Sequence, residues 1–299
     1  MTNRTLLLVD AMAVVYRAYY AISGLSTRSG KPTNALFGFI KMVHQLEELW
    51  KPTHWSVVFD AGIPAERLEK LPSYKAQREP MPDPLREQIP AIEEFIERSQ
   101  IAAIRVAGYE ADDAVASLVR WAEPQDARVL IASSDKDLFQ LITDRVSMVS
   151  PTKIGTLTGP AEVVEKTGVR PDQIVDWLAL TGDAVDNIPG VPGIGPKTAA
   201  KLLAEFGSVD KLLAGADQIE SARLREAIGA HREAIRRNVS LVSLRKDLPL
   251  AGDWDALKRV PPDPSRLLSF YREMEFGSLA EKVKGRQSVN LSFDFGEPG

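Results

Sequence analysis

The chain has 299 residues, 44% hydrophobic and 26% charged, which is ordinary for a globular protein of one large or two smaller domains. It has no cysteine, which excludes disulfides, thiolate zinc sites and cysteine nucleophiles and makes a reducing cytoplasm the expected compartment. The net charge of −4 argues, taken alone, against a nucleic-acid partner, and the first apolar run ends at Asp10, too early for a signal peptide or a membrane span.

Strand-like and helix-like segments alternate along the first part of the chain. In order, the pattern predicts a strand over 5–10, a helix over 34–50, a strand over 55–60 and a helix over 84–99. A strand over 101–108, a helix from near Glu110 to Trp121 and a strand over 127–135 follow. Such alternation predicts an α/β domain over 1–183, with a mostly parallel twisted sheet and helices on both faces.

Proline and glycine become dense over 186–198, and the pattern changes there. Helical segments around 196–206, 208–214 and 219–239 follow without clear strands. We therefore expect a mostly helical region over 184–285 and a tail over 286–299.

Acidic residues stand where predicted strands end. Asp10, Asp60 and Asp135 each close a strand, and ligands of open parallel sheets bind at that edge. Any one of them could be a helix N-cap or a turn residue. The segments GYEADD, SSDKD and LTGDAVDN add six more acids, most of them beside an apolar segment. The complete set is Asp10, Asp60, Glu110, Asp112, Asp113, Asp135, Asp137, Asp183 and Asp186.

This set predicts a metal centre. Oxygen ligands without histidine or cysteine suit Mg²⁺ or Mn²⁺, and nine carboxylates exceed the needs of one ion, so two or more ions are expected. Paired divalent ions activate water and stabilise the oxygens of a phosphodiester displacement. Setting these nine negative charges aside changes −4 to +5, so the remaining surface can bind a phosphate backbone.

Six segments, in a fixed order, carry a family pattern. They are LLLVDAMAVVYRAYYA, PTHWSVVFDA, YKAQREPMPDPLREQIP, GYEADD, SSDKDLFQL and LALTGDAVDNIPGVPGIGPKTAAKLL. Together they resemble the 5′-nuclease domain of bacterial DNA polymerase I, within the flap-endonuclease family, up to about residue 285. The resemblance implies a PIN-like sheet, a helical arch over about 62–90 and a helix–hairpin–helix-like element over about 186–206. It also implies metal-dependent hydrolysis of 5′ ends, nicked duplexes and 5′-flaps in DNA repair and replication, with RNA–DNA hybrids as further substrates. A monomer is the default expectation.

The resemblance also assigns roles. Lys75 and Arg78 match a basic pair near the base of the arch, where they would stabilise the scissile phosphate, although both could be ordinary surface cations. Asp112 joins them among the catalytic residues, since Asp112 or Asp113 would lie between two metals. The first metal is expected at Asp10, Asp60, Glu110 and Asp112, and the second at Asp135, Asp137, Asp183 and Asp186.

Three further residues are candidates for DNA contact. Tyr74 could stack on a base or pack the arch. Tyr16, four residues before Tyr20, could be a core aromatic or could stack on the displaced nucleotide, and Arg17 could reach a phosphate.

The segment GVPGIGPKTAAKLL predicts sequence-independent duplex binding. Its glycines let backbone N–H groups approach phosphates, and proline suits the first turn of the next helix, although a plain turn between helices is the alternative. Related hairpins often bind a monovalent cation through carbonyls, which makes K⁺ a candidate ligand. The residues expected to face DNA are Gly190, Gly193, Gly195, Lys197, Thr198 and Lys201.

Rival interpretations concern the tail and the activity. The polymerase continues after this domain, so the chain is interpreted as a stand-alone nuclease or a truncated piece. The tail segment NLSFDF loosely resembles a sliding-clamp peptide but lacks its leading glutamine, so a strand on the domain or a disordered end are alternatives.

Two other activities are alternatives to the nuclease. A non-catalytic binder of branched DNA would use the same surfaces. An RNase or NYN-type nuclease would share the acidic edge but would not need the hairpin.

Overall fold

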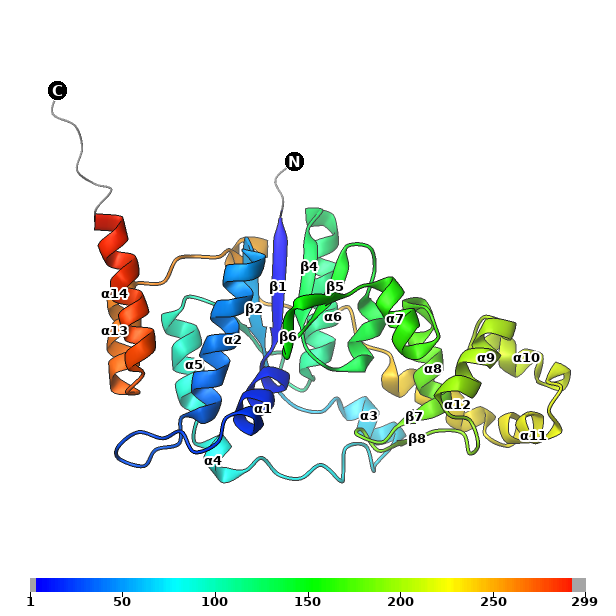
Figure 1. The fold of residues 1–299 in the computed structure, drawn as a ribbon. Coiled ribbons are helices and arrows are strands. Elements are labelled where there is room, and N and C mark those ends of the chain that lie inside the picture. The colour runs from blue at the N-terminus through cyan, green and yellow to red at the C-terminus, as the bar shows by residue number, and fades with distance from the viewer. Residues whose placement is uncertain (1–3, 292–299) are drawn as a thin grey trace.

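A six-stranded sheet forms the centre of the computed structural model, which describes residues 4–291 and the side chains of 4–285 (Figure 1). The spatial order is β3-β2-β1-β4-β5-β6, and all neighbours are parallel except β5 and β6. This confirms the predicted mostly parallel α/β sheet. The strands are β1 (Thr5–Asp10), β2 (His54–Val58), β3 (Ala102–Ile104), β4 (Arg128–Ala132), β5 (Val146–Ser150) and β6 (Lys153–Thr158).

Helices cover both faces of the sheet, so its central strands are apolar throughout. Along β1, Leu6 and Leu8 join one apolar cluster and Leu7 and Val9 join the other, as the alternation of a strand requires. The helices that contribute to the Leu7 cluster are α1 (Ala11–Ala21), α2 (Asn34–Trp50), α5 (Ile89–Arg98), α13 (Pro264–Glu273) and α14 (Gly277–Leu291). The Leu6 cluster includes α6 (Ala111–Ala122), α7 (Pro160–Thr167) and α8 (Ile174–Thr181).

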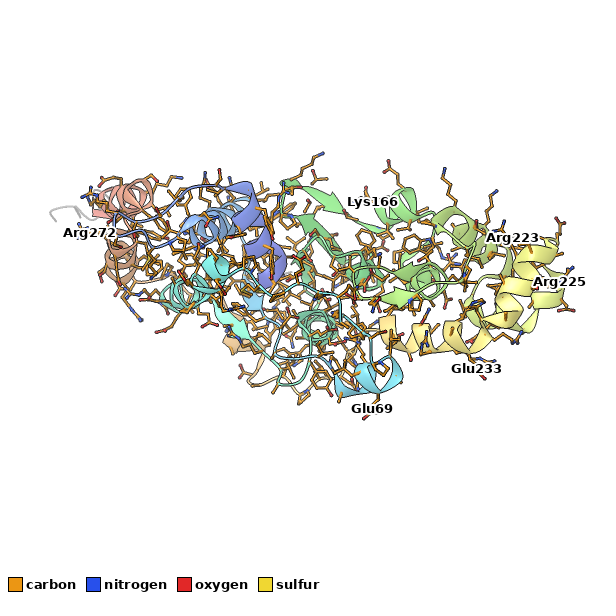
Figure 2. The ribbon with its side chains drawn as sticks, turned by 90° about the horizontal axis from the view of Figure 1, so that it is seen from below. Glu69, Lys166, Arg223, Arg225, Glu233 and Arg272 are labelled. Atoms are coloured by element: carbon orange, nitrogen blue, oxygen red, sulfur yellow. The ribbon has the colours of Figure 1, made fainter. Side chains whose placement is uncertain are left out.

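The Leu6 cluster continues into a helical region at one end of the elongated molecule, where Arg223, Arg225 and Glu233 lie on the outside (Figure 2). A two-stranded hairpin, β7 (Gly182–Asp183) with β8 (Ile188–Pro189), leads into it. The helices that follow are α9 (Pro196–Phe206), α10 (Val209–Ala214), α11 (Ala222–Ala230) and α12 (Arg232–Val242). In the described part of the chain, every helix is too short or too polar to span a bilayer.

The segment expected to form a helical arch is helical only near its ends, in α3 (Ala65–Lys70) and α4 (Asp83–Arg86). Prolines at positions 72, 80 and 82 explain the interruption, because proline lacks the N–H that an interior helical position needs, whereas Pro84 lies in the first turn of α4, where proline is tolerated. The stretch between α3 and α4 is fastened to the β7–β8 hairpin. The Lys75 N–H donates to the Asp186 carbonyl (3.0 Å), and the Asn187 amide donates to the Ser73 carbonyl (2.6 Å).

Two differences from the sequence expectations concern the edges of the fold. Strands β5 and β6 were not predicted, and the strand expected over 101–108 spans only Ala102–Ile104. At the other end, α14 continues to Leu291, past the expected start of a tail at 286. Residues 292–299, which carry most of the sliding-clamp segment, lie outside the described residues, and the clamp contact stays a prediction.

Candidate active site

The acidic edge is built by the turns that follow the parallel strands. The last residue of β1, Asp10, caps α1 by accepting from the Ala13 N–H (3.1 Å), and its other oxygen accepts from the Ser133 hydroxyl beyond β4 (2.7 Å). After β2, Asp60 accepts from the Ala111 N–H at the start of α6 (2.9 Å). These bonds hold the ends of β1, β2 and β4 and the start of α6 at one edge, where strand order reverses between β1 and β4.

Five acids at this edge form no ion pair with lysine, arginine or histidine of the described chain, and we call them the unpaired aspartates. Burial raises the pKa of Asp10 to about 6, and the charges of Asp60 and Asp135 add to this effect. Burial also raises the pKa of Asp112 and of Asp137 well above the usual value, and both feel the charge of Asp135. The set is Asp10, Asp60, Asp112, Asp135 and Asp137.

The unpaired aspartates fit a hard divalent cation. One Asp137 oxygen is buried without any hydrogen-bond partner, a costly state that a cation would relieve. Oxygen-only donors that repel one another are suited to Mg²⁺ or Mn²⁺. As the side chains stand, no three histidine, aspartate or glutamate residues among those described already converge on one point that could hold an ion. Ion binding would therefore require some carboxylates to reorient.

The remaining acids are neutralised by protein cations, and we call them the paired acids: Glu110, Asp113, Asp183 and Asp186. Glu110 is buried and contacts the Arg67 guanidinium and the Lys75 ammonium, and it accepts from the Tyr74 hydroxyl (3.0 Å). Its two oxygens are therefore already occupied by donors. Any role for Glu110 as a metal ligand would have to displace one of them.

Asp113 is neutralised within the protein. Its two oxygens accept a bidentate pair from Arg67 at 2.8 Å each, and one also accepts from the Arg245 N–H (2.9 Å). Consecutive residues of a helix point about 100° apart, so Asp112 can face the sheet edge while Asp113 faces α3 and α12. A role of Asp113 as a metal ligand stays a prediction and would require the displacement of Arg67.

Lys75 and Arg78 lie beside the acidic edge with their charges on protein carboxylates. Arg78 donates to Asp186 (2.9 Å) and is half-exposed, whereas Lys75 is buried between Glu110 and Asp186. Burial alone would lower the pKa of Lys75, but the two carboxylates raise it, so the side chain stays an ammonium. Across the site, Asp183 pairs with Lys136 (3.3 Å).

Of the three candidate DNA contacts, Tyr74 has a position that suits only one of its two predicted roles, packing of the arch. It is 4% exposed, and its hydroxyl donates to Glu110 and to Asp186 (2.9 Å), so it packs the base of the arch and presents no face for base stacking. Tyr16 is half-buried and stacks on the exposed Tyr20 with ring centroids 6.4 Å apart. Arg17 is exposed on the same helix, which starts at the acidic edge.

The glycines of the turn between β8 and α9, which is the hairpin turn of the predicted DNA-binding element, have different environments. A Cβ on Gly190 would lie 2.2 Å from the Thr181 carbonyl oxygen, so this glycine serves close backbone packing rather than phosphate approach. Gly193 has φ +82° at an exposed turn, and Gly195 caps α9 facing open space. On α9, Lys197 and Lys201 are exposed and Thr198 is half-buried.

Two arginines at these sites were missed by the sequence analysis. Arg67 is 4% exposed and neutralises Glu110 and Asp113, although AERLEK has the composition of an exposed helix. The dense acids of GYEADD were the only signal that a cation must be near. Arg223 lies over the hairpin turn, 3.3 Å from where a Cβ on Gly193 would stand, and nothing in its local sequence indicates this.

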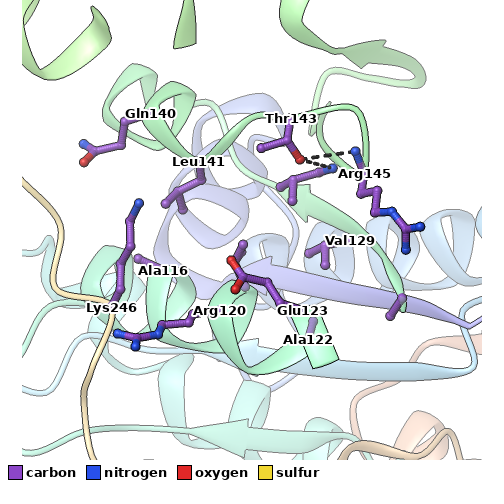
Figure 3. A pocket seen from close by; sticks show the side chains of 13 residues that line it. Ala116, Arg120, Ala122, Glu123, Val129, Gln140, Leu141, Thr143, Arg145 and Lys246 are labelled. Carbon is purple, nitrogen blue, oxygen red and sulfur yellow. Dashed lines mark hydrogen bonds between the residues drawn. The ribbon is translucent and has the colours of Figure 1, made fainter. Parts of the chain in front are cut away.

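A pocket of about 170 Å³ lies elsewhere, at the starts of β4 and β5 (Figure 3). Arg120, Glu123, Arg145 and Lys246 surround an apolar floor that includes Val129. Because it opens at the strand ends opposite the aspartates, it is not part of the acidic edge.

Comparison with known proteins agrees with this architecture. Residues 5–168 match the model of the 5′-3′ exonuclease N-terminal resolvase-like domain, and residues 169–265 match that of the 5′-3′ exonuclease C-terminal SAM fold. A 5′-3′ exonuclease of Aquifex aeolicus is 38% identical over 94% of this chain and 95% of its own length. The thermostable DNA polymerase I of Thermus aquaticus is 44% identical over 91% of this chain, which spans about a third (32%) of the polymerase.

A solved structure shows the same fold in a phage enzyme. The flap endonuclease of bacteriophage T5, in a pseudo-enzyme-product complex with DNA and metal ions, superposes with a TM-score of 0.67 and 26% identity, covering 80% of this chain and 89% of that one. With both family models matched in order along most of its length, the chain belongs to the 5′-3′ exonuclease family.

Proposed function

We propose that this chain hydrolyses phosphodiesters at 5′ ends and 5′-flaps of DNA with the help of two or more divalent ions. The observation that carries the proposal is the group of unpaired aspartates beside Lys75 and Arg78. Asp10 and Asp137 are buried and Asp112 and Asp135 are half-buried, so a cation bound among these carboxylates would relieve their mutual repulsion. Family membership and the T5 complex with DNA and metal ions support the same conclusion.

The unpaired aspartates would hold Mg²⁺ or Mn²⁺, with Asp183, Asp186 and Glu110 at the margin of the site. Bound divalent ions supply activation of water and stabilisation of charge on the scissile phosphate. Arg78 is half-exposed and would meet the phosphate first. A substrate phosphate would compete with Asp186 for Arg78 and with Glu110 and Asp186 for Lys75, which places both cations against the developing charge.

The helical region would hold the duplex without base specificity. Lys197 and Lys201 extend from α9, and Arg223 lies over the Gly193 turn, so three cations surround one hairpin. Tyr16 and Arg17, on a helix that begins at the acidic edge, would meet the strand entering the site. A K⁺ ion at the hairpin, RNA–DNA hybrid substrates, action as a monomer and roles in repair and replication belong to the same proposal.

A non-catalytic binder of branched DNA is the alternative. It would bring a polyanion against five aspartates without cations, and that repulsion would weaken binding. The acidic edge therefore favours the nuclease.

Cleavage of a 5′-labelled flap duplex tests the proposal. The protein is assayed with Mg²⁺, with Mn²⁺ and with EDTA, beside Asp112→Ala and a control, Glu123→Gln, whose carboxylate lies at the opposite strand ends. We expect cutting near the junction with either metal, none with EDTA, loss in Asp112→Ala and normal cutting in Glu123→Gln. Tight flap binding without cutting in any metal would instead establish the binder.

A further inference from the structure

One buried arginine joins the three parts of the molecule that must act together. Arg67 lies on α3, at the start of the arch segment, and only 4% of it is exposed. Its guanidinium donates to Asp113 and contacts Glu110, both at the start of α6. It also donates to the Leu241 carbonyl (3.1 Å) and the Ser243 carbonyl (3.4 Å), at the end of α12.

At the start of α6, Arg67 binds two acids that lie three residues apart. The fork of Arg67 holds both oxygens of Asp113, and one of its nitrogens reaches Glu110 as well. Glu110 in turn contacts Lys75, which the proposed function places against the scissile phosphate. Arg67 therefore contributes to the position of Lys75 through Glu110, while Asp186 holds the same ammonium from the other side (3.4 Å).

The contacts with α12 make the position of Arg67 dependent on the docking of that helix. The last carbonyls of a helix have no intrahelical partner, and Arg67 supplies a donor to two of those at the end of α12. The guanidinium can keep all its bonds only while the end of α12 is docked against α3 and α6. Since α12 packs on α8, which leads into the hairpin, the DNA-binding helices and the acidic edge share this arginine.

We propose that Arg67 is a positioning residue for the nuclease reaction, coupling the docking of α12 to the placement of Glu110 and Lys75. The inference rests on the proposed function and adds to it a connection between duplex binding and the reacting centre. Loss of Arg67 should lower kcat, because Lys75 is misplaced, while the cations that bind the duplex are unchanged.

The test compares matched variants. Arg67→Met alone leaves Asp113 buried and unpaired, so it is joined by Arg67→Met with Asp113→Asn, which removes both charges, and by Arg67→Lys. The control is Arg245→Met. Its side chain pairs with Glu66 on the same helix α3 (3.3 Å) and with Asp247 (2.9 Å), while the backbone bond from Arg245 to Asp113 is retained.

Flap cleavage, thermal unfolding and hydrogen exchange are measured on each protein. In the double variant we expect recovery of most of the thermal stability that Arg67→Met loses, with the Leu241 and Ser243 carbonyls still lacking their donor. We expect its kcat to be about 100-fold lower than that of the wild type, with KM within about threefold. Arg67→Lys should recover part of kcat, and Arg245→Met should match the wild type. Flap binding in EDTA should increase protection at 108–116 in the wild type and not in the double variant, while protection of α9–α12 increases in both.

The two proposals can fail separately. Restoration of both stability and kcat in the double variant would show that Arg67 is only structural and would overturn the coupling. Equal protection at 108–116 in the wild type and the double variant would do the same. A wild type that shows the coupled protection but cuts no flap would uphold the coupling and overturn the proposed nuclease activity.

Discussion

The acidic edge has two halves, the paired acids and the unpaired aspartates, whose carboxylates are neutralised in different ways. Arg67, Lys75, Arg78 and Lys136 neutralise the paired acids, whereas the unpaired aspartates receive no cation from the described chain. The boundary runs between adjacent residues, with Asp112 in one half and Asp113 in the other. We expect the acids that the protein neutralises itself to contribute to stability or to the margin of the metal site, and the unpaired aspartates to hold the diffusible ions.

The largest effect should come from the unpaired half. Asp112→Asn should lower single-turnover flap cleavage by about 10³-fold or more, because several kcal/mol of transition-state stabilisation depend on bound metal. In EDTA the same variant should unfold at an equal or higher urea concentration, since a repelling charge has gone. An Asp112→Asn protein that is active but destabilised would break the distinction between the halves.

The paired half should respond in the opposite sense. Asp113→Asn leaves Arg67 with one carboxylate in place of two and should cost about 3 kcal/mol of unfolding free energy. Its requirement for metal should be unchanged. Urea unfolding measures the loss, and Asp172→Asn is the control, since its exposed pair with Arg170 should contribute little to stability. A loss no larger than that of the control would count against neutralisation by Arg67.

The next largest effect should be the pH dependence of the unfolding free energy of the metal-free protein, which the unpaired aspartates should dominate. The pKa of Asp10 is raised from 3.8 to about 6, so the folded state binds the proton more tightly than the unfolded state. Stability should therefore fall as pH rises from about 4 to 7, by roughly 2 to 3 kcal/mol for this group alone. Urea titrations in EDTA at pH 4 and pH 7 measure the difference. Asp10→Asn should flatten the curve, and Mg²⁺ should stabilise the wild type more at pH 7.

The acids were predictable because strand ends can be found from short apolar runs. Asp10 ends such a run and Asp135 follows another after two serines, and parallel pairing then brings them to one edge without any knowledge of side-chain contacts. β5 and β6 were missed because their half-buried, polar sequences, VSMVS and KIGTLT, lack a continuous apolar run. The arch was expected to be helical from resemblance alone, while its prolines indicated otherwise.

The division of the acids could not be predicted from the sequence. Asp112 and Asp113 are identical in type and adjacent, and only the rotation along α6 and the distant Arg67, 46 residues away, separate their roles. A hydrogen bond from Tyr74 to Asp186 spans 112 residues, so no local pattern could show that the ring is buried. Contacts of this length arise from tertiary packing.

The lysines also fall into a paired and an unpaired group, and their substitution should give the smallest changes in activity and binding. Lys75 faces protein carboxylates at the acidic edge, whereas Lys197 and Lys201 are exposed on α9 and have no ion pair within the described chain. Lys201→Ala should raise the Kd for flap DNA by about threefold to tenfold and reduce the salt slope of log Kd by about 1, with kcat unchanged. Lys75→Ala should instead lower kcat and leave that slope nearly unaltered, because its charge is already matched within the protein.

Binding titrations over a range of salt concentrations, with cleavage rates on the same samples, measure both effects. Lys258→Ala serves as the control, since the side chain of Lys258 pairs with Asp255 and its backbone lies beside His54 at the start of β2, away from α9. Equal salt slopes for Lys201→Ala and Lys258→Ala would mean that α9 does not meet the phosphate backbone. The assignment of exposed cations to the duplex and paired cations to the reacting phosphate would then be wrong, even if the unpaired aspartates still bound metal.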